Sequence, residues 1–270
     1  MKLAYQVAMP DLEPSPLLTS YYGSLEESFS CLAENGYQGI ELMVRDPQKM
    51  DVDDLDKLIR RYHLEIVMLA TGEIWAQDHI SLSSSDAGCR SRCIKRFKEF
   101  IDCAAPYHAQ VNIGRVRGEL VPGVPHEKTM ELAIDAFCEL ADYAKPRGVT
   151  IALEPVNFLQ CNFINSTAEG RAVVDQVGRE NFRIMLDVFH MNIQDADILE
   201  EIRKSKGYFS YVHLCDNNRQ FPGSCGFDFP AILKALHGIG YEDYVSVEIL
   251  QLPTPETAVS KSAQLLLPLL

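Results

Sequence analysis

The segment VTIALEP, residues 149–155, holds the pattern that decides the fold of this chain. An uninterrupted apolar run follows Gly148 and ends abruptly in a glutamate, Glu154. An apolar run of this length without alternation is typical of a strand buried on both faces, as in a parallel sheet. The glutamate therefore stands where such a strand leaves the sheet.

Runs of the same kind recur along the 270 residues, and amphipathic stretches typical of helices separate them. The apolar runs are Leu3–Met9, Gly39–Val44, Glu65–Ala70, Ala109–Gly114, Val149–Glu154, Phe182–Asp187, Tyr208–Cys215 and Tyr244–Leu250. The helical stretches include Leu25–Asn35, Val52–Tyr62, Cys89–Ala105, Lys128–Lys145, Ala168–Val177 and Phe229–Ile239. Strand–helix units without a linker predict one α/β domain over residues 1–270, a single (β/α)8 TIM barrel. A doubly wound open sheet is the alternative, and it is weakened because no glycine-rich phosphate motif follows a strand.

The composition limits the classes of function. Asp and Glu number 38 against 25 Lys and Arg, which argues against a nucleic-acid-binding protein. No apolar run reaches the roughly 20 residues of a membrane span, and the eight cysteines show no CxxC spacing. Together with the short, polar N-terminus, these features predict a cytoplasmic protein that acts on a small molecule. Arg115, Arg117 and Arg219 lie near predicted strand ends and are candidates for attracting an anionic group.

Ionisable residues interrupt the last four apolar runs at or near their ends. Strand five ends in Glu154 and strand six in Asp187, whereas strand seven carries His213 and strand eight carries Glu248. The active site of such a barrel lies at the carboxyl ends of the strands. Burying an unpaired carboxylate there costs several kcal/mol, so four adjacent strands need a common partner. Three carboxylates and one imidazole suit a divalent ion, with Mn²⁺ favoured over Mg²⁺, Co²⁺ or Zn²⁺.

The chain also resembles a known family along nearly its whole length. The stretches that carry the resemblance are YQGIELMVRDP, LATGEIW, NIGRVRG, LEPVN, FINSTAE, LDVFHMNI, VHLCDNNR, PGSCGFDF and SVEILQLP. They are similar to the sugar phosphate isomerase/epimerase family of xylose isomerase-like TIM barrels. Within that family, the pattern resembles the D-tagatose 3-epimerase type of ketose 3-epimerase and 5-keto-L-gluconate epimerase-like proteins. The resemblance implies a homo-oligomer, a dimer or tetramer.

The resemblance implies roles for individual residues. Glu154, Asp187, His213 and Glu248 match the metal ligands, and the two glutamates also match the catalytic acid/base pair. His190 and Arg219 match groups that hold the substrate. The sequence departs from the family pattern at two places. Phe158–Gln160 replaces an Arg-aromatic-Glu stretch, and Gly226 stands where relatives have a histidine.

Three further residues are candidates for contact with a sugar substrate. Glu41 and Glu73 follow or end predicted strands and are expected to hydrogen-bond it. Trp75, the only tryptophan, is expected to stack on the apolar face of a sugar. A structural salt bridge for each glutamate and plain packing for the tryptophan are the alternatives.

The combined pattern predicts a metal-dependent epimerase or isomerase of a ketose or keto-sugar acid. The paired glutamates indicate proton transfer through an enediolate, which a bound cation stabilises. An inosose-type dehydratase and an aldose–ketose isomerase are alternatives that use the same site. A metal-free sugar-binding barrel is a further alternative, from a class without catalysis.

Overall fold

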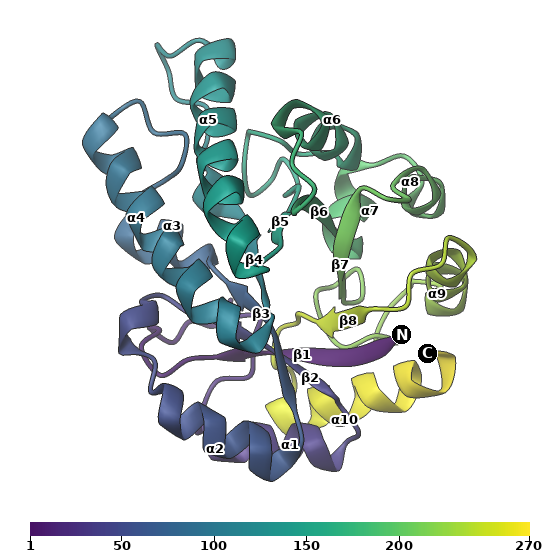
Figure 1. Ribbon diagram of the computed structural model, residues 1–270. Helices are drawn as coiled ribbons and strands as arrows, with labels where there is room; N and C mark the ends of the chain where they lie inside the picture. The colour runs from purple at the N-terminus through teal and green to yellow at the C-terminus, as the bar shows by residue number, and fades with distance from the viewer.

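The computed structural model describes all 270 residues, and its centre is a closed barrel of eight parallel strands (Figure 1). The strands are β1 (Lys2–Ala8), β2 (Gly39–Met43), β3 (Glu65–Ala70), β4 (Gln110–Ile113), β5 (Ile151–Leu153), β6 (Phe182–Asp187), β7 (Phe209–Leu214) and β8 (Tyr244–Val247). Each strand pairs with its neighbours in chain order, and β8 pairs with β1. The predicted barrel is therefore confirmed, and the open doubly wound sheet is excluded.

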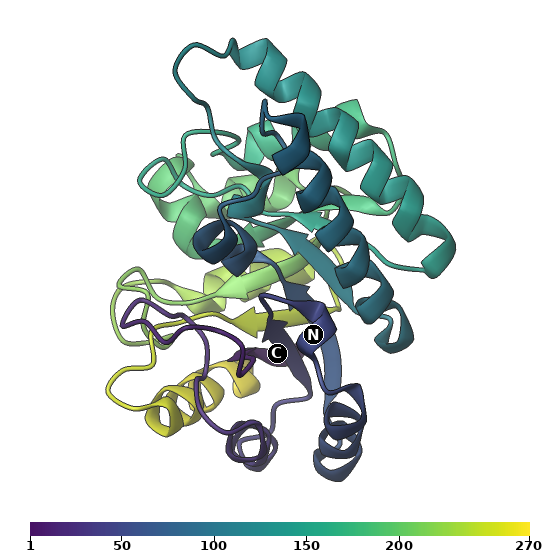
Figure 2. The ribbon, with the colours of Figure 1, turned by 90° about the vertical axis from the view of Figure 1, so that its left-hand side faces the viewer.

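Helices cover the outside of the barrel, and the two chain termini lie next to each other in both views (Figures 1 and 2). The longer helices are α1 (Leu25–Glu34), α2 (Val52–Tyr62), α4 (Ala87–Ala104), α5 (His126–Ala144), α6 (Thr167–Val177), α9 (Phe229–Gly238) and α10 (Pro255–Leu266). Seven-residue helices also occur, namely α3 (Gly72–Asp78), α7 (Val188–Gln194) and α8 (Ile198–Lys204). None of the helices is both long enough and apolar enough to cross a membrane.

The seven-residue helices were not expected from the sequence. Two turns of helix are too short to display an amphipathic period. Helices α3 and α7 also begin within two residues of the end of a strand. In α7 the inward-facing positions carry His190 as well as apolar residues, which blurs the pattern further.

Side chains inside the barrel form two layers. The residues of the upper layer lie two positions after those of the lower layer in the same strands. The lower layer is a small apolar cluster that includes Ala152, Met185 and Tyr211. Two residues further along the same strands stand Glu154, Asp187 and His213. Residues i and i+2 of a strand face the same side. The upper layer, directly above the apolar one, therefore consists of ionisable side chains. The lower layer closes the barrel and leaves its carboxyl end open as a pocket.

The Arg117 side chain fixes the loops that follow β4 and β5. It is fully buried, and its guanidinium donates hydrogen bonds of 2.7–3.1 Å to four backbone carbonyls, those of Gly114, Glu154, Phe163 and Ile164. The expectation that Arg117 attracts an anionic substrate is therefore wrong, because its guanidinium is bound to these carbonyls and Arg117 does not line the pocket. Arg117 has a structural role, because it donates a hydrogen bond to the backbone carbonyl of Glu154.

Replacing Arg117 by methionine should destabilise the protein strongly. Four carbonyls would each lose a guanidinium donor, and those of Glu154 and Ile164 would lose the only side-chain donor they have, which costs at least about 3 kcal/mol in the free energy of unfolding. Urea denaturation followed by circular dichroism measures this loss. Arg147→Met is the matched control, because the Arg147–Asp102 ion pair is exposed and such pairs contribute about 0–1 kcal/mol. Equal losses in the two variants would contradict the assigned role of Arg117.

Candidate active site

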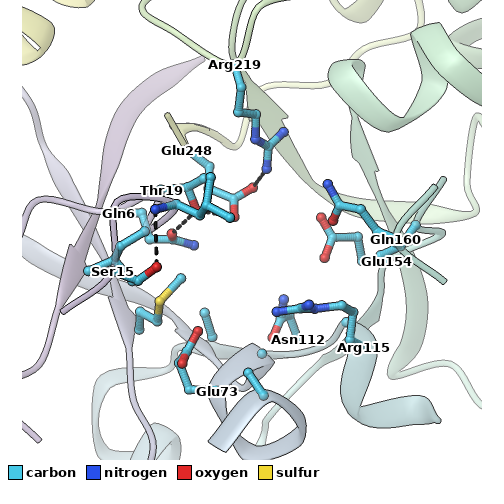
Figure 3. A pocket seen from close by; sticks show the side chains of 18 of the residues that line it. Gln6, Ser15, Thr19, Glu73, Asn112, Arg115, Glu154, Gln160, Arg219 and Glu248 are labelled. Atoms are coloured by element: carbon cyan, nitrogen blue, oxygen red, sulfur yellow. Dashed lines mark hydrogen bonds and ion pairs between the residues drawn. The ribbon is translucent and has the colours of Figure 1, made fainter. Parts of the chain in front are cut away.

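The four residues predicted as metal ligands converge at the carboxyl end of the barrel. Asp187 and His213 lie in β6 and β7, and Glu154 and Glu248 directly follow β5 and β8. One potential ligand atom from each lies within 4.8 Å of the others. Figure 3 shows Glu154 and Glu248 facing each other across the pocket. The sequence therefore identified residues that the fold brings together.

Two buried atoms of this cluster have no hydrogen-bond partner, and their chemistry shows whether the residues fit a cation. They are Oε1 of Glu154 and Nδ1 of His213. His213 Nδ1 lies 3.5 Å from that Glu154 oxygen, 3.8 Å from Asp187 Oδ2 and 3.0 Å from Glu248 Oε2. Buried polar atoms without partners are rare and call for an explanation. A carboxylate oxygen and an imidazole nitrogen that are both unpartnered and lie close together are suitable ligands for a divalent cation.

Arg219 supplies positive charge at the edge of the cluster. Its guanidinium lies 2.7 Å from Asp187 Oδ2, contacts Glu248 Oε2, and stacks on the Phe189 ring at 4.8 Å. Burial alone would raise the pKa of Asp187, but Arg219, together with His213, outweighs burial and holds that pKa well below its usual value. The same balance, with Arg219 and His213 opposing burial, lowers the pKa of Glu248 to about 2. Both carboxylates are therefore ionised at neutral pH.

The backbone of Arg219 is held in a conformation that a non-glycine residue rarely adopts. Its φ is +59°, and such left-handed positions persist only where the surroundings fix them. Its N–H donates to the Asp216 carbonyl, and its own carbonyl accepts from Leu250 N–H. The Asp216 carboxylate organises the same loop by accepting five backbone N–H bonds, from Asn217, Gly223, Cys225, Gly226 and Phe227.

Glu41 lies behind His213, away from the pocket. Its Oε2 is 2.8 Å from His213 Nε2, and its Oε1 accepts a hydrogen bond from Gln6 Nε2 at 2.9 Å. Both oxygens are thus engaged, and the side chain is fully buried. The expected contact between Glu41 and a substrate therefore has no support in the geometry. Glu41 instead orients the imidazole so that Nε2 carries the proton and Nδ1 faces the cluster.

His190 faces the pocket with a defined tautomer. Asn157 Nδ2 lies 2.7 Å from His190 Nδ1, so an amide donor makes Nδ1 the acceptor and leaves the proton on Nε2. That Nε2 lies 3.8 Å from Glu154 Oε1 and 3.7 Å from Asp187 Oδ2. Burial lowers the pKa of His190 and outweighs the nearby carboxylates. The imidazole is therefore neutral and presents an N–H donor beside the cluster.

A pocket of about 700 Å³ opens above the cluster, and both expected and unexpected residues line it. Glu73, His190 and Arg219, three residues predicted to contact a substrate, line it. Trp75 does not line it, because its ring instead carries the Arg115 guanidinium at 4.9 Å. The expected stacking of Trp75 on a sugar therefore has no support in the geometry. Gly114 leaves room for the Glu154 carboxylate, since a Cβ at position 114 would lie 3.1 Å from Glu154 Oε2.

Sequence reasoning missed several polar residues of the site. Thr19 donates a hydrogen bond of 2.9 Å to Glu248 Oε1 from the loop after β1, and nothing in the local pattern marks that residue. Gln6 and Asn112 interrupt apolar strands, a signal of the kind that exposed Glu154. Asn157 stands in the LEPVN motif but had no assigned role. Figure 2 shows why distant loops contribute, because those preceding α1, α9 and α10 gather on one side of the barrel.

Comparison with known proteins places the chain among sugar-converting barrels. The model of the xylose isomerase-like TIM barrel family matches residues 29–269. An L-ribulose 3-epimerase of Mesorhizobium japonicum is 30% identical, covering 85% of this chain and 77% of the relative. A solved structure of L-ribulose 3-epimerase is 27% identical with a TM-score of 0.80, covering 98% and 93% of the two chains. A D-allulose 3-epimerase structure from Methylomonas sp. shares the fold at 20% identity, with a TM-score of 0.84 and coverage of 100% and 98%.

Replacing Glu41 by glutamine should weaken cation binding without removing any ligand atom. A glutamine amide can donate to His213 Nε2, which moves the imidazole proton to Nδ1, the atom that faces the cluster. Loss of such a supporting contact typically costs about 10- to 100-fold in metal affinity. Isothermal titration with Mn²⁺ measures the change. Glu65→Gln is the control, because Glu65 makes only an exposed pair with Lys2. An unchanged affinity in Glu41→Gln would contradict this role.

Proposed function

The chain belongs to the xylose isomerase-like TIM barrel family, in which it is a sugar epimerase or isomerase, and we propose that it is a ketose 3-epimerase. The reaction inverts the carbon next to the ketone by removing a proton from one face and returning one to the other. The observation that carries this proposal is the pair of carboxylates, Glu154 and Glu248, on opposite sides of one pocket (Figure 3). The names of the relatives support the same reaction.

Glu154 and Glu248 are suited to move the proton between the two faces. Glu154 has a free buried oxygen, Oε1, that no donor occupies. Glu248 is fixed from one side by the Thr19 hydroxyl and from the other by Arg219. A carboxylate on each face of a bound ketose can act as base toward one epimer and as acid toward the other. Because epimerisation is reversible, the two residues exchange these roles with the direction of reaction.

This reaction also requires that the negative charge developing on the carbonyl oxygen be stabilised. We propose that Glu154, Asp187, His213 and Glu248 hold one divalent cation. When bound, it polarises the ketone and stabilises that charge. His190 Nε2–H is placed to donate a hydrogen bond to a substrate oxygen at the same centre, and Asn157 keeps that proton in place. Arg219 is placed to bind a neighbouring hydroxyl. The buried lower layer of the barrel excludes water from beneath.

The donor set supports Mn²⁺ as the working metal, because three carboxylates and one imidazole suit a hard to borderline ion. All eight cysteines are free thiols, which supports a cytoplasmic location. Exposed apolar side chains on the loop after β5, Phe158 and Leu159, support a homodimer or tetramer that covers them. A dehydratase or a hydride-shift isomerase would use the same residues, but no feature of the pocket favours either.

Glutamine at position 154 or 248 should reduce epimerisation by at least about 100-fold, the usual contribution of a general base or acid. Each glutamine keeps an oxygen that can ligate the cation. In D₂O the wild-type enzyme should place solvent deuterium on the inverted carbon of D-psicose or D-fructose. Each variant keeps one carboxylate, so it should exchange deuterium into only one of the two epimers. Mass spectrometry and NMR of the recovered sugars measure both effects.

The variants distinguish the proposed reaction from its alternatives. Epimer formation without deuterium would contradict proton transfer and indicate a hydride shift. Release of water from the sugar would indicate a dehydratase. Full epimerase activity in either variant would contradict the assigned acid/base pair. Glu169→Gln is the control, since Glu169 caps helix α6 outside the pocket.

A further inference from the structure

The two proposed proton carriers are restrained to different degrees. Oε1 of Glu248 accepts a hydrogen bond of 2.9 Å from the Thr19 hydroxyl, whereas no group donates a hydrogen bond to the Glu154 carboxylate. The other oxygen of Glu248, Oε2, lies 3.0 Å from His213 Nδ1 and contacts Arg219. The two oxygens of Glu248 therefore have different surroundings, with Oε2 facing the cluster and Oε1 held by Thr19.

The Thr19 hydroxyl is placed by backbone contacts that do not involve its side chain. Ile249, the residue directly after Glu248, donates its N–H to the Thr19 carbonyl at 2.8 Å. Tyr21 N–H donates to the Gln6 carbonyl at 2.9 Å, which ties the same segment of chain to β1. The segment is thus bonded to β1 on one side and to the end of β8 on the other. A side chain of the same shape at position 19 should leave it in place.

Gln6 gives the Thr19 hydroxyl a second partner. Thr19 Oγ1 lies 3.4 Å from Gln6 Oε1. The orientation of the Gln6 amide is fixed, because its Nε2 donates to Glu41 Oε1 at 2.9 Å and a carboxylate only accepts. A hydroxyl donates one hydrogen bond and can also accept. Thr19 can therefore donate to Glu248 as a carboxylate, or accept from Glu248 as a carboxylic acid and donate to Gln6 instead.

We propose that Thr19 is a positioning residue for Glu248, and that its hydroxyl turns between Glu248 and Gln6 as the proton leaves and returns to the substrate (Figure 3). This inference rests on the proposed epimerase function. In the step concerned, the C–H bond at the inverted carbon breaks, its electron pair passes into the enediolate, and Glu248 Oε1 takes the proton. The Thr19 hydroxyl then accepts from the new O–H group. Return of the proton to carbon reverses each of these changes.

A hydroxyl that serves only Glu248 has an effect on one of the two epimers. Figure 3 places Glu154 on the opposite side of the pocket from Thr19 and Glu248. Proton exchange at the substrate face served by Glu154 should therefore proceed without Thr19, whereas exchange at the face served by Glu248 should need it. A general loss of folding or of the cation would instead affect both epimers, so selectivity for one epimer identifies the proposed role.

Thr19→Val, which keeps the branched shape and removes the hydroxyl, tests the proposal by deuterium exchange in D₂O. Exchange into recovered D-psicose and recovered D-fructose is followed by NMR at times too short for much interconversion. One epimer should lose about 10- to 100-fold in exchange rate, as expected for a hydrogen bond to a charged group. It should be the same epimer that Glu248→Gln fails to exchange. The other epimer should exchange within about threefold of the wild-type rate.

Three comparisons support the interpretation of that result. Thr19→Ser should restore exchange into both epimers, because serine keeps the hydroxyl. Mn²⁺ affinity, measured by isothermal titration as a readout apart from activity, should be equal in wild type and Thr19→Val, because Glu248 keeps Oε2, the oxygen that faces His213. Thr150→Val is the matched control, since Thr150 lies directly before β5 at the amino end of the barrel. It should exchange both epimers as the wild type does.

The outcomes separate this inference from the proposed function. Wild-type exchange rates for both epimers in Thr19→Val would overturn the inference and leave the epimerase intact. Equal loss for both epimers, selective loss for the epimer that depends on Glu154, or weaker Mn²⁺ binding would also overturn it, because each gives Thr19 a different role. A Thr19→Ser variant as slow as Thr19→Val would exclude a role of the hydroxyl. No exchange by the wild-type enzyme into any ketose would instead contradict the proposed function, and the inference with it.

Discussion

Three buried carboxylates that meet around one imidazole are the constraint on which the rest of this structure depends. Each ionised carboxylate taken out of water carries a penalty of several kcal/mol, and Glu154, Asp187 and Glu248 also repel one another. Arg219 contributes one positive charge. Without a cation, His213 contributes a second by taking up a proton on Nδ1 as well as Nε2, because Glu41, Glu248 and the other carboxylates overcome burial and raise its pKa well above the usual value. Together with Glu41 behind His213, four carboxylates face two positive charges, so the cluster is incompletely compensated. A divalent cation that replaces the His213 proton would supply one charge more.

The surrounding structure keeps this costly arrangement from relaxing. Arg117 fixes the backbone of Glu154 from below, and Glu41 fixes the ring of His213 from behind. Asp216 gathers the backbone N–H groups of the loop that carries Arg219. These supports lie on different strands and loops, so Glu154 and His213 are held independently of each other. A pre-formed site of this kind lowers the reorganisation needed during the reaction.

The sequence predicted the barrel and the four converging residues because both follow from local pattern. Apolar runs identify buried parallel strands, and in a parallel barrel the carboxyl ends of all strands meet at one face. Glu154, Asp187, His213 and Glu248 were found on that basis. The resemblance to sugar epimerases added their proposed roles, along with those of His190 and Arg219.

The sequence could not place Glu41, Trp75 or Arg117, because strand position alone does not say which partner a side chain meets. Glu41 interrupts strand β2 in the same way that Glu154 ends the apolar run of β5. The register of the barrel, however, places Glu41 beside Gln6 and behind His213. Trp75 and Arg117 lie in short helices whose direction depends on tertiary contacts. The loop residue Thr19 reaches Glu248 across 229 positions of the chain, a contact that no local pattern encodes.

A crystal structure of the protein grown with Mn²⁺, with anomalous scattering recorded at the manganese edge, tests the central claim most directly. The account predicts one anomalous peak per chain, bonded to His213 Nδ1 and to oxygens of Glu154, Asp187 and Glu248. The otherwise unpartnered Oε1 of Glu154 should be among those oxygens. A peak bound elsewhere, or none at saturating Mn²⁺, would contradict the claim that this carboxylate cluster is a cation site.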